Sequence, residues 1–231
     1  MDTEFTKIPG HIRNRTTFDF PVRYQVIAGA TAERLVTHAD PSLLEPFIQA
    51  AKELEAAGVS AITGACGFLV IFQKELADAV DAPLYTSSLI QLPMVGRMIR
   101  SDQKVGLLVA QERSLTPRHL EAIGAEDVPV AVVGMEDQPE FREVMLEARR
   151  VSLDVKRLER EVLSVVERLV GGNLGALVIE CTDLVPFAHT IQARLGLPVF
   201  DIVTLTDMVY RSLTRTPFTP APHPANPTPR L

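Results

Sequence analysis

The sequence predicts an α/β fold with two pseudo-symmetric parallel-sheet domains and an active site in the cleft between them. Apolar, β-branched runs alternate with longer helical patterns, which is typical of parallel sheets covered by helices. The chain also repeats itself. Cys66 and Cys181 each end an apolar run, and each lies 17 residues before a proline, Pro83 or Pro198, that opens another short apolar run. Two halves that each place a thiol at the end of a strand indicate a site built between them.

Each expected element follows from its local pattern. The apolar, β-branched runs predict strands at Val22–Ala28, Val59–Ala65, Leu84–Thr86, Val105–Ala110, Val128–Val133, Ala176–Glu180 and Val199–Ile202. Helical periodicity predicts helices at Ser42–Ala57, Phe68–Val80, Ser88–Arg100, Glu140–Arg150, Leu153–Val170, Leu184–Leu195 and Thr204–Leu213. In the longest of these, Leu158, Val162 and Val166 share one face, which predicts a buried stripe with a charged outer face.

The repeat divides the chain into residues 1–100 plus 201–215 for the first α/β domain and 101–200 for the second. The second half begins with the strand expected at Val105–Ala110, whereas the equivalent first-half strand would fall at or before Met1. We therefore expect either a shortened first sheet or a natural protein that begins upstream of the recorded start. Residues 216–231 contain six prolines, which predicts an extended or disordered tail. A tail lying across a partner subunit is the alternative.

The composition limits the partners. The chain has 231 residues, of which 46% are apolar and 23% charged, as in an ordinary globular protein. A net charge of −6 without a basic cluster argues against nucleic acid and anionic membranes. The sequence shows no run near the roughly 18 apolar residues of a membrane span, no signal peptide and no metal-ligand spacing. We expect a cytoplasmic protein with reduced thiols and no metal, so a Cys66–Cys181 disulfide is the less favoured interpretation.

Both cysteines fall at strand-to-helix junctions, beyond the carboxyl ends of strands, where open parallel sheets bind ligands. The helix N-terminus after each cysteine offers free N–H groups and partial positive charge, which are expected to lower a thiol pKa and to attract a carboxylate. Gly67 leaves room for a ligand beside Cys66. Two facing thiols suit removal and return of a proton next to a carboxylate without a cofactor. The alternative is a pair of cysteines that only fill a core.

Three blocks carry a resemblance to a known family. Ile62–Gly67, Val178–Asp183 and Leu197–Asp201 resemble the aspartate/glutamate racemase superfamily, which includes hydantoin racemases, arylmalonate decarboxylase and maleate isomerase. The resemblance covers residues 2–210, and the Cys-Thr-acid block at Cys181 is most similar to the aspartate racemase branch. It implies two similar α/β domains, a cofactor-independent site in the cleft and a small carboxylate substrate, and it is compatible with a homodimer.

The resemblance also implies roles for individual residues. Cys66 and Cys181 would act on opposite faces of the substrate. Thr182 would hold the substrate carboxylate, helped by Thr86 and Ser87. Asp183 would assist or orient the thiol beside it.

Further assignments near the N-terminus complete the implied site. Asp2 resembles the acidic residue that supports the first thiol, and Asn14 would contact the substrate. Where many amino-acid racemases have Asn-Thr after the first cysteine, this chain has Gly67 and Phe68, which predicts a more apolar pocket. His11 is expected near the cleft, where it is interpreted as a surface residue.

We therefore predict a cofactor-independent racemase or epimerase of a small carboxylic acid, an amino acid or a derivative. Cys66 and Cys181 would transfer protons at the carbon next to the carboxylate. One alternative is an isomerase or decarboxylase of the same fold that uses mainly one cysteine. The other is a non-catalytic protein that binds a small acid.

Overall fold

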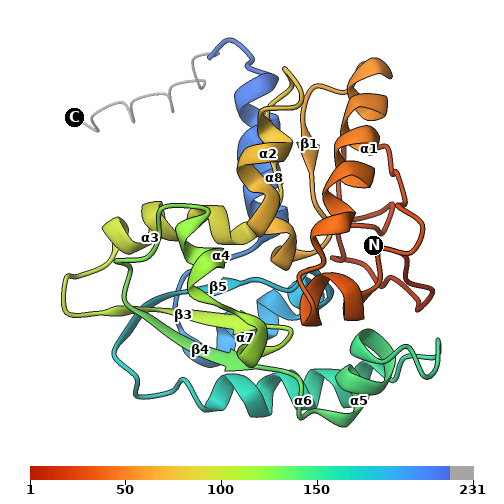
Figure 1. Ribbon diagram of the computed structural model, residues 1–231. Helices are drawn as coiled ribbons and strands as arrows, with labels where there is room; N and C mark the ends of the chain where they lie inside the picture. Colours follow the sequence, from red (N-terminus) through yellow and green to blue (C-terminus); the bar gives the residue numbers. More distant parts are fainter. Residues whose placement is uncertain (219–231) are drawn as a thin grey trace, which may run out of the picture.

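The computed structural model describes residues 1–218 and contains two parallel sheets (Figure 1). In the four-stranded sheet, ordered β4-β3-β5-β6, the central strands are β3 (Lys104–Val109) and β5 (Leu174–Ile179). The outer strands are β4 (Val130–Gly134) and β6 (Val199–Phe200). The second sheet pairs only β1 (Ile62–Thr63) with β2 (Leu84–Tyr85). The predicted parallel α/β fold class is confirmed.

Helices connect the strands and cover the sheets, as right-handed parallel crossovers require. They are α1 (Leu44–Ala56), α2 (Gln73–Ala77), α3 (Leu92–Met98), α4 (Pro117–Glu121), α5 (Pro139–Phe141), α6 (Val155–Glu167), α7 (Ala188–Leu195) and α8 (Ile202–Leu213). In Figure 1 the four-stranded sheet occupies the lower part of the molecule with α6 below it, whereas β1, α1, α2 and α8 form the upper part.

The core is centred on β3 and β5. The apolar side chains of both strands are buried, because helices cover the sheet on both faces and the strands read as continuous apolar runs. The stripe predicted on the longest helix is confirmed, since Leu158, Val162 and Val166 of α6 are fully buried against this sheet.

The internal repeat is visible in the local structure. Each cysteine is followed by a six-residue 3-10 helix, Gly67–Phe72 or Thr182–Phe187, and then by an α-helix, α2 or α7. Upstream, each half has a π-helical turn, Glu33–Thr37 or Arg142–Leu146, followed by an α-helix of 13 residues, α1 or α6. The two halves therefore share one plan, and they differ mainly in their sheets.

Two expected elements are wrong. Residues 22–28 form no strand, because no neighbouring strand offers them a hydrogen-bonding partner in the described chain. The helix expected at Glu140–Arg150 is replaced by the short α5 and the π-helical turn Arg142–Leu146. Most of the predicted tail lies outside the described residues. The domain boundaries at 100 and 200 stay a prediction.

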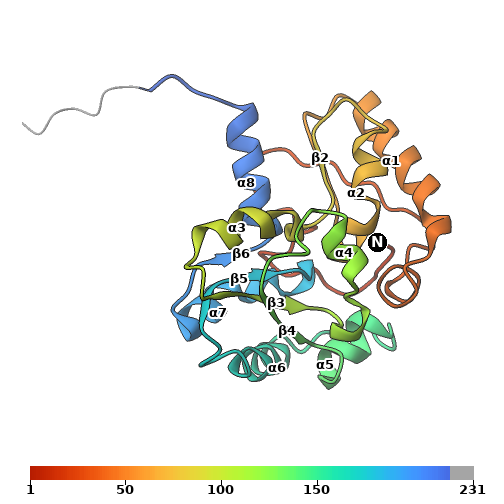
Figure 2. The same ribbon diagram turned by 60° about the vertical axis from the view of Figure 1, so that its left-hand side comes forward.

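The C-terminal helix α8 returns to the first half of the molecule. The ring of Phe20 stacks on Tyr210 of α8, with ring centroids 3.9 Å apart. In Figure 2 the N-terminal part of the chain, in red, runs from α8 toward α1.

Candidate active site

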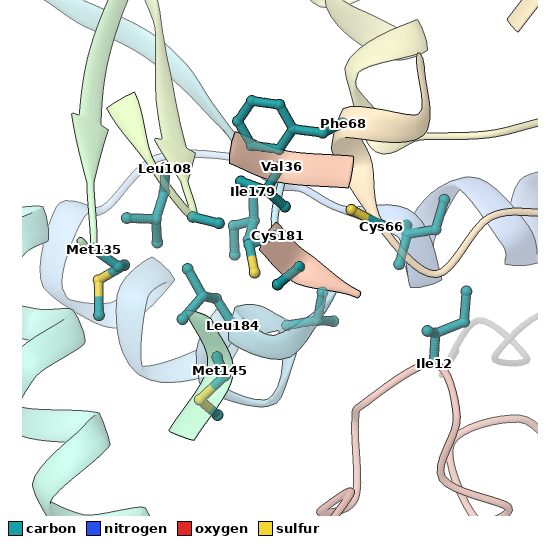
Figure 3. Packing of buried hydrophobic residues seen from close by; sticks show 14 of the residues in the cluster. Ile12, Val36, Cys66, Phe68, Leu108, Met135, Met145, Ile179, Cys181 and Leu184 are labelled. Atoms are coloured by element: carbon teal, nitrogen blue, oxygen red, sulfur yellow. The ribbon is translucent and has the colours of Figure 1, made fainter. Parts of the chain in front are cut away.

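Both thiols line one small cavity. Cys66 lies three residues after the end of β1 and Cys181 two residues after the end of β5, so both lie beyond the carboxyl ends of their strands. Both are free thiols and buried. Figure 3 shows their sulfur atoms on adjacent segments, with Val36, Leu184 and Met145 nearby. The cavity has a volume of about 20 Å³, room for roughly one water molecule.

Hydrogen bonds link the two cysteine loops across the halves. The Thr182 hydroxyl, next to Cys181, donates to the backbone oxygen of Ala65, next to Cys66, over 3.1 Å. The Ser88 hydroxyl from the first half donates to the Ile179 oxygen at the end of β5 over 2.6 Å. These bonds fix the position of one thiol relative to the other.

The thiols are not activated in this cavity. Burial raises the pKa of Cys66 to about 12, and the Glu180 carboxylate adds to the effect. Burial also raises the pKa of Cys181 well above its usual value, followed by the charges of Asp183 and Glu180. Backbone N–H groups, of Phe68 for the first thiol and Asp183 for the second, act in the opposite direction but are outweighed. The expectation of a lowered thiol pKa is therefore wrong here, because desolvation exceeds the effect of the short helix ends.

Glu180 is a site residue that the sequence reasoning missed. Its side chain is only 1% exposed, and its Oε2 accepts a hydrogen bond from the Ala110 N–H over 3.0 Å. Burial raises the pKa of this carboxyl to about 8, although the backbone amides of Ala110, Phe68 and Gly67 favour the ionised form. The signal in the sequence was an acidic residue at the end of an otherwise apolar strand.

The position of the Glu180 side chain leaves room only for glycine at position 67. A Cβ atom at position 67 would lie 2.2 Å from Oε1 and 2.5 Å from Cγ of Glu180, far inside van der Waals contact. Because of this contact, the Asn found after the first cysteine in many amino-acid racemases would displace the Glu180 side chain. The departure at Gly67 and the acidic residue at 180 are thus one structural feature.

His11 is a second residue whose role was misjudged. It is 3% exposed rather than on the surface, and its Nε2 lies 2.7 Å from Oδ1 of Asp183. The backbone N–H of Arg13 donates to Nδ1 over 2.9 Å, which places the ring proton on Nε2. His11 therefore donates to Asp183 and orients this carboxylate beside Cys181.

The other expected site residues lie outside the cysteine cavity. Thr86 and Ser87 are buried, but the Thr86 hydroxyl donates to Gln73 and the Ser87 hydroxyl caps the turn at Leu89. The side chain of Asn14 bonds within its own loop.

Asp2 is exposed, and its carboxylate accepts from the Gly29 N–H over 3.2 Å. Gly67, Thr182 and Asp183 do line the cavity with the two thiols. The catalytic and binding roles of all these residues stay predictions.

The ionisable groups of the cavity are two carboxyl side chains, the two thiols and the amino group of Met1. Its lining includes the carboxyl side chains of Glu180 and Asp183 but, among residues 1–218, no Lys or Arg side chain. Apolar side chains, including Val36, Phe141 and Met145, close the remaining sides. A larger cavity of about 600 Å³ lies beside β1, but neither thiol lines it. Both thiols therefore belong to the smaller cavity.

Two further properties concern the described residues. His, Cys, Asp and Glu side chains within residues 1–218 do not gather in groups of three or more that would hold a metal ion. In the same part of the chain, no helix combines the length and apolar character needed to cross a membrane.

Comparison with known proteins identifies the family. The profile of the family described as Asp/Glu/Hydantoin racemase matches residues 24–206. The chain belongs to this family. The superfamily resemblance seen in the cysteine blocks is therefore confirmed.

Relatives of this Asp/Glu/Hydantoin racemase family member include lyases. Dimethylsulfoniopropionate lyase 3 of Emiliania huxleyi is 31% identical over 94% of this chain and 59% of its own length. Dimethylsulfoniopropionate lyase of Durusdinium sp. clade D is 29% identical over 94% of this chain and 74% of its own. The chain thus spans about three-fifths of the first of these relatives.

A solved structure supports the fold. The aspartate racemase of Picrophilus torridus superposes with a TM-score of 0.54 at 16% identity, covering 80% of this chain and 75% of that one. At this identity the likeness shows the racemase-type fold of the family.

Proposed function

We propose that this chain is a thiol-dependent lyase that eliminates a cationic leaving group from a small carboxylate. Dimethylsulfoniopropionate is the model substrate. The observation that carries the proposal is one cavity lined by two thiols and two acidic side chains, without Lys or Arg among its described lining residues. Two acidic side chains fit a substrate with a positive sulfonium group better than a dicarboxylic amino acid, and the cation opposite them is the amino group of Met1. The lyase names of relatives that match 94% of the chain support the same choice.

The reaction needs a single base. A thiolate would remove a proton from the carbon next to the substrate carboxylate. The electron pair left on that carbon forms the C=C bond of acrylate, while the C–S bond breaks and its electrons leave with sulfur as neutral dimethyl sulfide. The thiol first holds the proton and then releases it to solvent. Atoms and charge therefore balance without an oxidant or a second reactant.

Cys66 is the better candidate for this base. Glu180 and Asp183 both raise the pKa of the two thiols, but Asp183 is the larger charge effect on Cys181 and the smallest contribution at Cys66. Cys66 is therefore easier to ionise. Cys181 would support the opposite face of the substrate.

The substrate would supply the missing activation. A thiol with a pKa of about 12 is almost fully protonated at neutral pH. A sulfonium cation bound between the thiols and Glu180 favours the ionised form of each acid, because opposite charges at short range lower their pKa values. The two thiols would thus stay protonated, and therefore unreactive, until substrate binds.

Binding also requires the cavity to widen. Its volume of about 20 Å³ is smaller than any five-carbon sulfonium carboxylate. Val36 on one π-helical turn and Met145 on the other close it from opposite halves, so we propose that these two turns move apart to admit substrate. Backbone N–H groups at the starts of the two 3-10 helices would then receive the carboxylate.

A two-thiol racemase is the second candidate. The observation in its favour is the repeat itself, which places a thiol after the equivalent strand in both halves. A racemase needs both thiols, one on each face, whereas the elimination needs only one base.

The test follows both reactions by NMR in D₂O, with dimethylsulfoniopropionate and with a panel of amino acids and hydantoins. The wild type, Cys66→Ala and Cys181→Ala are compared. Release of acrylate and dimethyl sulfide, lost on Cys66→Ala and reduced less on Cys181→Ala, supports the lyase.

Exchange with inversion on a panel member, lost in both variants, supports the racemase. No turnover, together with shifts of the Cys66 or Cys181 resonances on adding a panel acid, indicates a binding protein. Either of these last two results overturns the lyase proposal.

A further inference from the structure

The residue before the cysteine differs between the two halves. The repeat matches Cys66 with Cys181, and the same alignment matches Ala65 with Glu180. Ala65 has only a methyl group, and its backbone oxygen accepts the Thr182 hydroxyl over 3.1 Å. Glu180 instead has a carboxyl side chain that is 1% exposed and lines the cavity of the two thiols. Of two equivalent positions, only the one in the second half therefore offers an acid to this cavity.

The Glu180 carboxyl reaches across to backbone groups of two other segments. Its Oε2 accepts a hydrogen bond from the Ala110 N–H, directly after β3, over 3.0 Å. Its Oε1 lies against Gly67 of the first half, because a Cβ atom added there would overlap this oxygen. The N–H groups of Gly67 and Phe68 also favour the ionised carboxyl, although burial raises its pKa to about 8. The side chain thus takes up the N–H groups that follow Cys66.

The matching N–H groups of the second half are not covered in this way. Thr182 and Asp183 begin the second 3-10 helix as Gly67 and Phe68 begin the first. The residue that corresponds to Glu180 is Ala65, which has no carboxyl to place over them. The cavity is therefore asymmetric, with backbone N–H groups free to receive a ligand carboxylate on the Thr182 side and occupied ones on the Gly67 side.

This occupation holds in either protonation state of Glu180. An ionised carboxylate accepts hydrogen bonds with both oxygens, and a protonated carboxyl keeps most of that capacity. The side chain also fills space beside Cys66 in a cavity of only about 20 Å³. A second carboxylate that entered there would have to push Glu180 off the N–H groups and leave it buried without partners, which is costly.

We propose that Glu180 limits this site to substrates with a single carboxylate. Its carboxyl holds the place that a second carboxylate would take beside Cys66, and the carboxylate of the substrate binds on the Thr182 side. The other end of the substrate then faces Glu180, where a neutral or positive group is accepted. The inference rests on the proposed function, since it takes this cavity as the seat of a small carboxylate substrate.

The first test uses the unchanged protein. Propionate, with one carboxylate, and succinate, with two, are titrated into the isotope-labelled chain and followed by amide NMR. Propionate is expected to shift the Thr182 and Asp183 amides and to leave the Ala110 amide, which stays bonded to Glu180, nearly unchanged. Succinate is expected to bind at least about tenfold more weakly, a difference of about 1.4 kcal/mol.

Two variants then separate occupation from charge. Glu180→Ala uncovers the N–H groups of Gly67, Phe68 and Ala110, so succinate should bind at least about tenfold more tightly than to the wild type and shift these amides. Glu180→Gln is the matched control, because it keeps the size and an acceptor oxygen but cannot carry the charge. It should keep the preference for propionate. If Glu180→Ala does not fold, the wild type and Glu180→Gln still decide.

Equal binding of propionate and succinate by the wild type overturns the proposal, as do propionate shifts centred on Ala110 instead of Thr182. A gain for succinate in Glu180→Gln as large as in Glu180→Ala overturns it too, since charge alone would then explain the selectivity. Acrylate release from dimethylsulfoniopropionate is measured on the same samples. Intact selectivity without acrylate release supports this proposal while it rejects the lyase.

Discussion

The two halves of this molecule form the same turn at the cysteine, but the strands and sheets that precede the turn differ. In the second half, Cys181 follows a six-residue strand held between two neighbours at the centre of a four-stranded sheet. In the first half, Cys66 follows a two-residue strand with one neighbour. The turn geometry is nevertheless repeated, down to a backbone amide two residues on that acts on each sulfur. Local sequence is therefore sufficient to form the turn, whereas the sheet decides how firmly it is held.

The largest expected effect separates the two thiols. Cys66→Ala should lower elimination by at least about 100-fold, the usual loss when a general base is removed. Cys181→Ala should lower it less. Initial rates of acrylate release measure both, and equal losses in the two variants would contradict the assignment of one base.

The next prediction compares the loss of stability at a buried strand of the second half with that at an exposed segment of the first half. Leu107→Ala in β3 removes a fully buried side chain and should lower the free energy of unfolding by about 2–5 kcal/mol. Val26→Ala, at an exposed position of the first half, should change it by no more than about 0.5 kcal/mol. Urea unfolding measures both values. A similar loss in the two variants would mean that the first half is as firmly packed as the second.

Gly67→Ala probes the contact between the halves. The added Cβ would overlap the Glu180 side chain, so we expect a loss of about 1–3 kcal/mol in unfolding free energy. The double variant with Glu180→Ala should recover part of this loss, because the overlapping atoms are gone. No recovery would place the strain elsewhere.

The smallest expected effect, and the most specific, is a difference in how two buried glutamates make stability depend on pH. Glu180 and Glu140 are each 1% exposed. Burial raises the pKa of Glu180 to about 8, whereas Arg150 lowers the pKa of Glu140. A raised carboxyl pKa stabilises the fold fully below the unfolded value near 4.5, and this contribution is lost as pH rises toward 8. A lowered pKa stabilises above 4.5, and this contribution is lost as pH falls.

Glu180→Gln should therefore flatten the decline in stability between pH 4.5 and 8. Glu140→Gln should flatten the decline on the acid side instead. Thermal unfolding measured from about pH 2 to about pH 8 covers both sides and gives the two profiles. Identical profiles for the two variants would show that the carboxyl of Glu180 is not held in its protonated form.

Much of this architecture could be predicted from the sequence. Apolar runs such as residues 105–109 and Leu174–Ile179 predict buried parallel strands because their side chains are apolar on both faces of the sheet. The equal spacing from Cys66 and Cys181 to their prolines predicts the repeat, and the cysteine blocks indicate the family.

Only the tertiary structure decided the rest. Whether residues 22–28 form a strand depends on a neighbour elsewhere in space, and local propensity contains no information about that neighbour. The fit of Glu180 over Gly67, and the approach of His11 to Asp183 across 172 positions of chain, are distances created by packing. The sequence by itself determined the two central strands and the turns that place a thiol after β1 and after β5. The fold decided their chemical state, because burial and the nearby carboxylates raise the pKa of each thiol above its ordinary value.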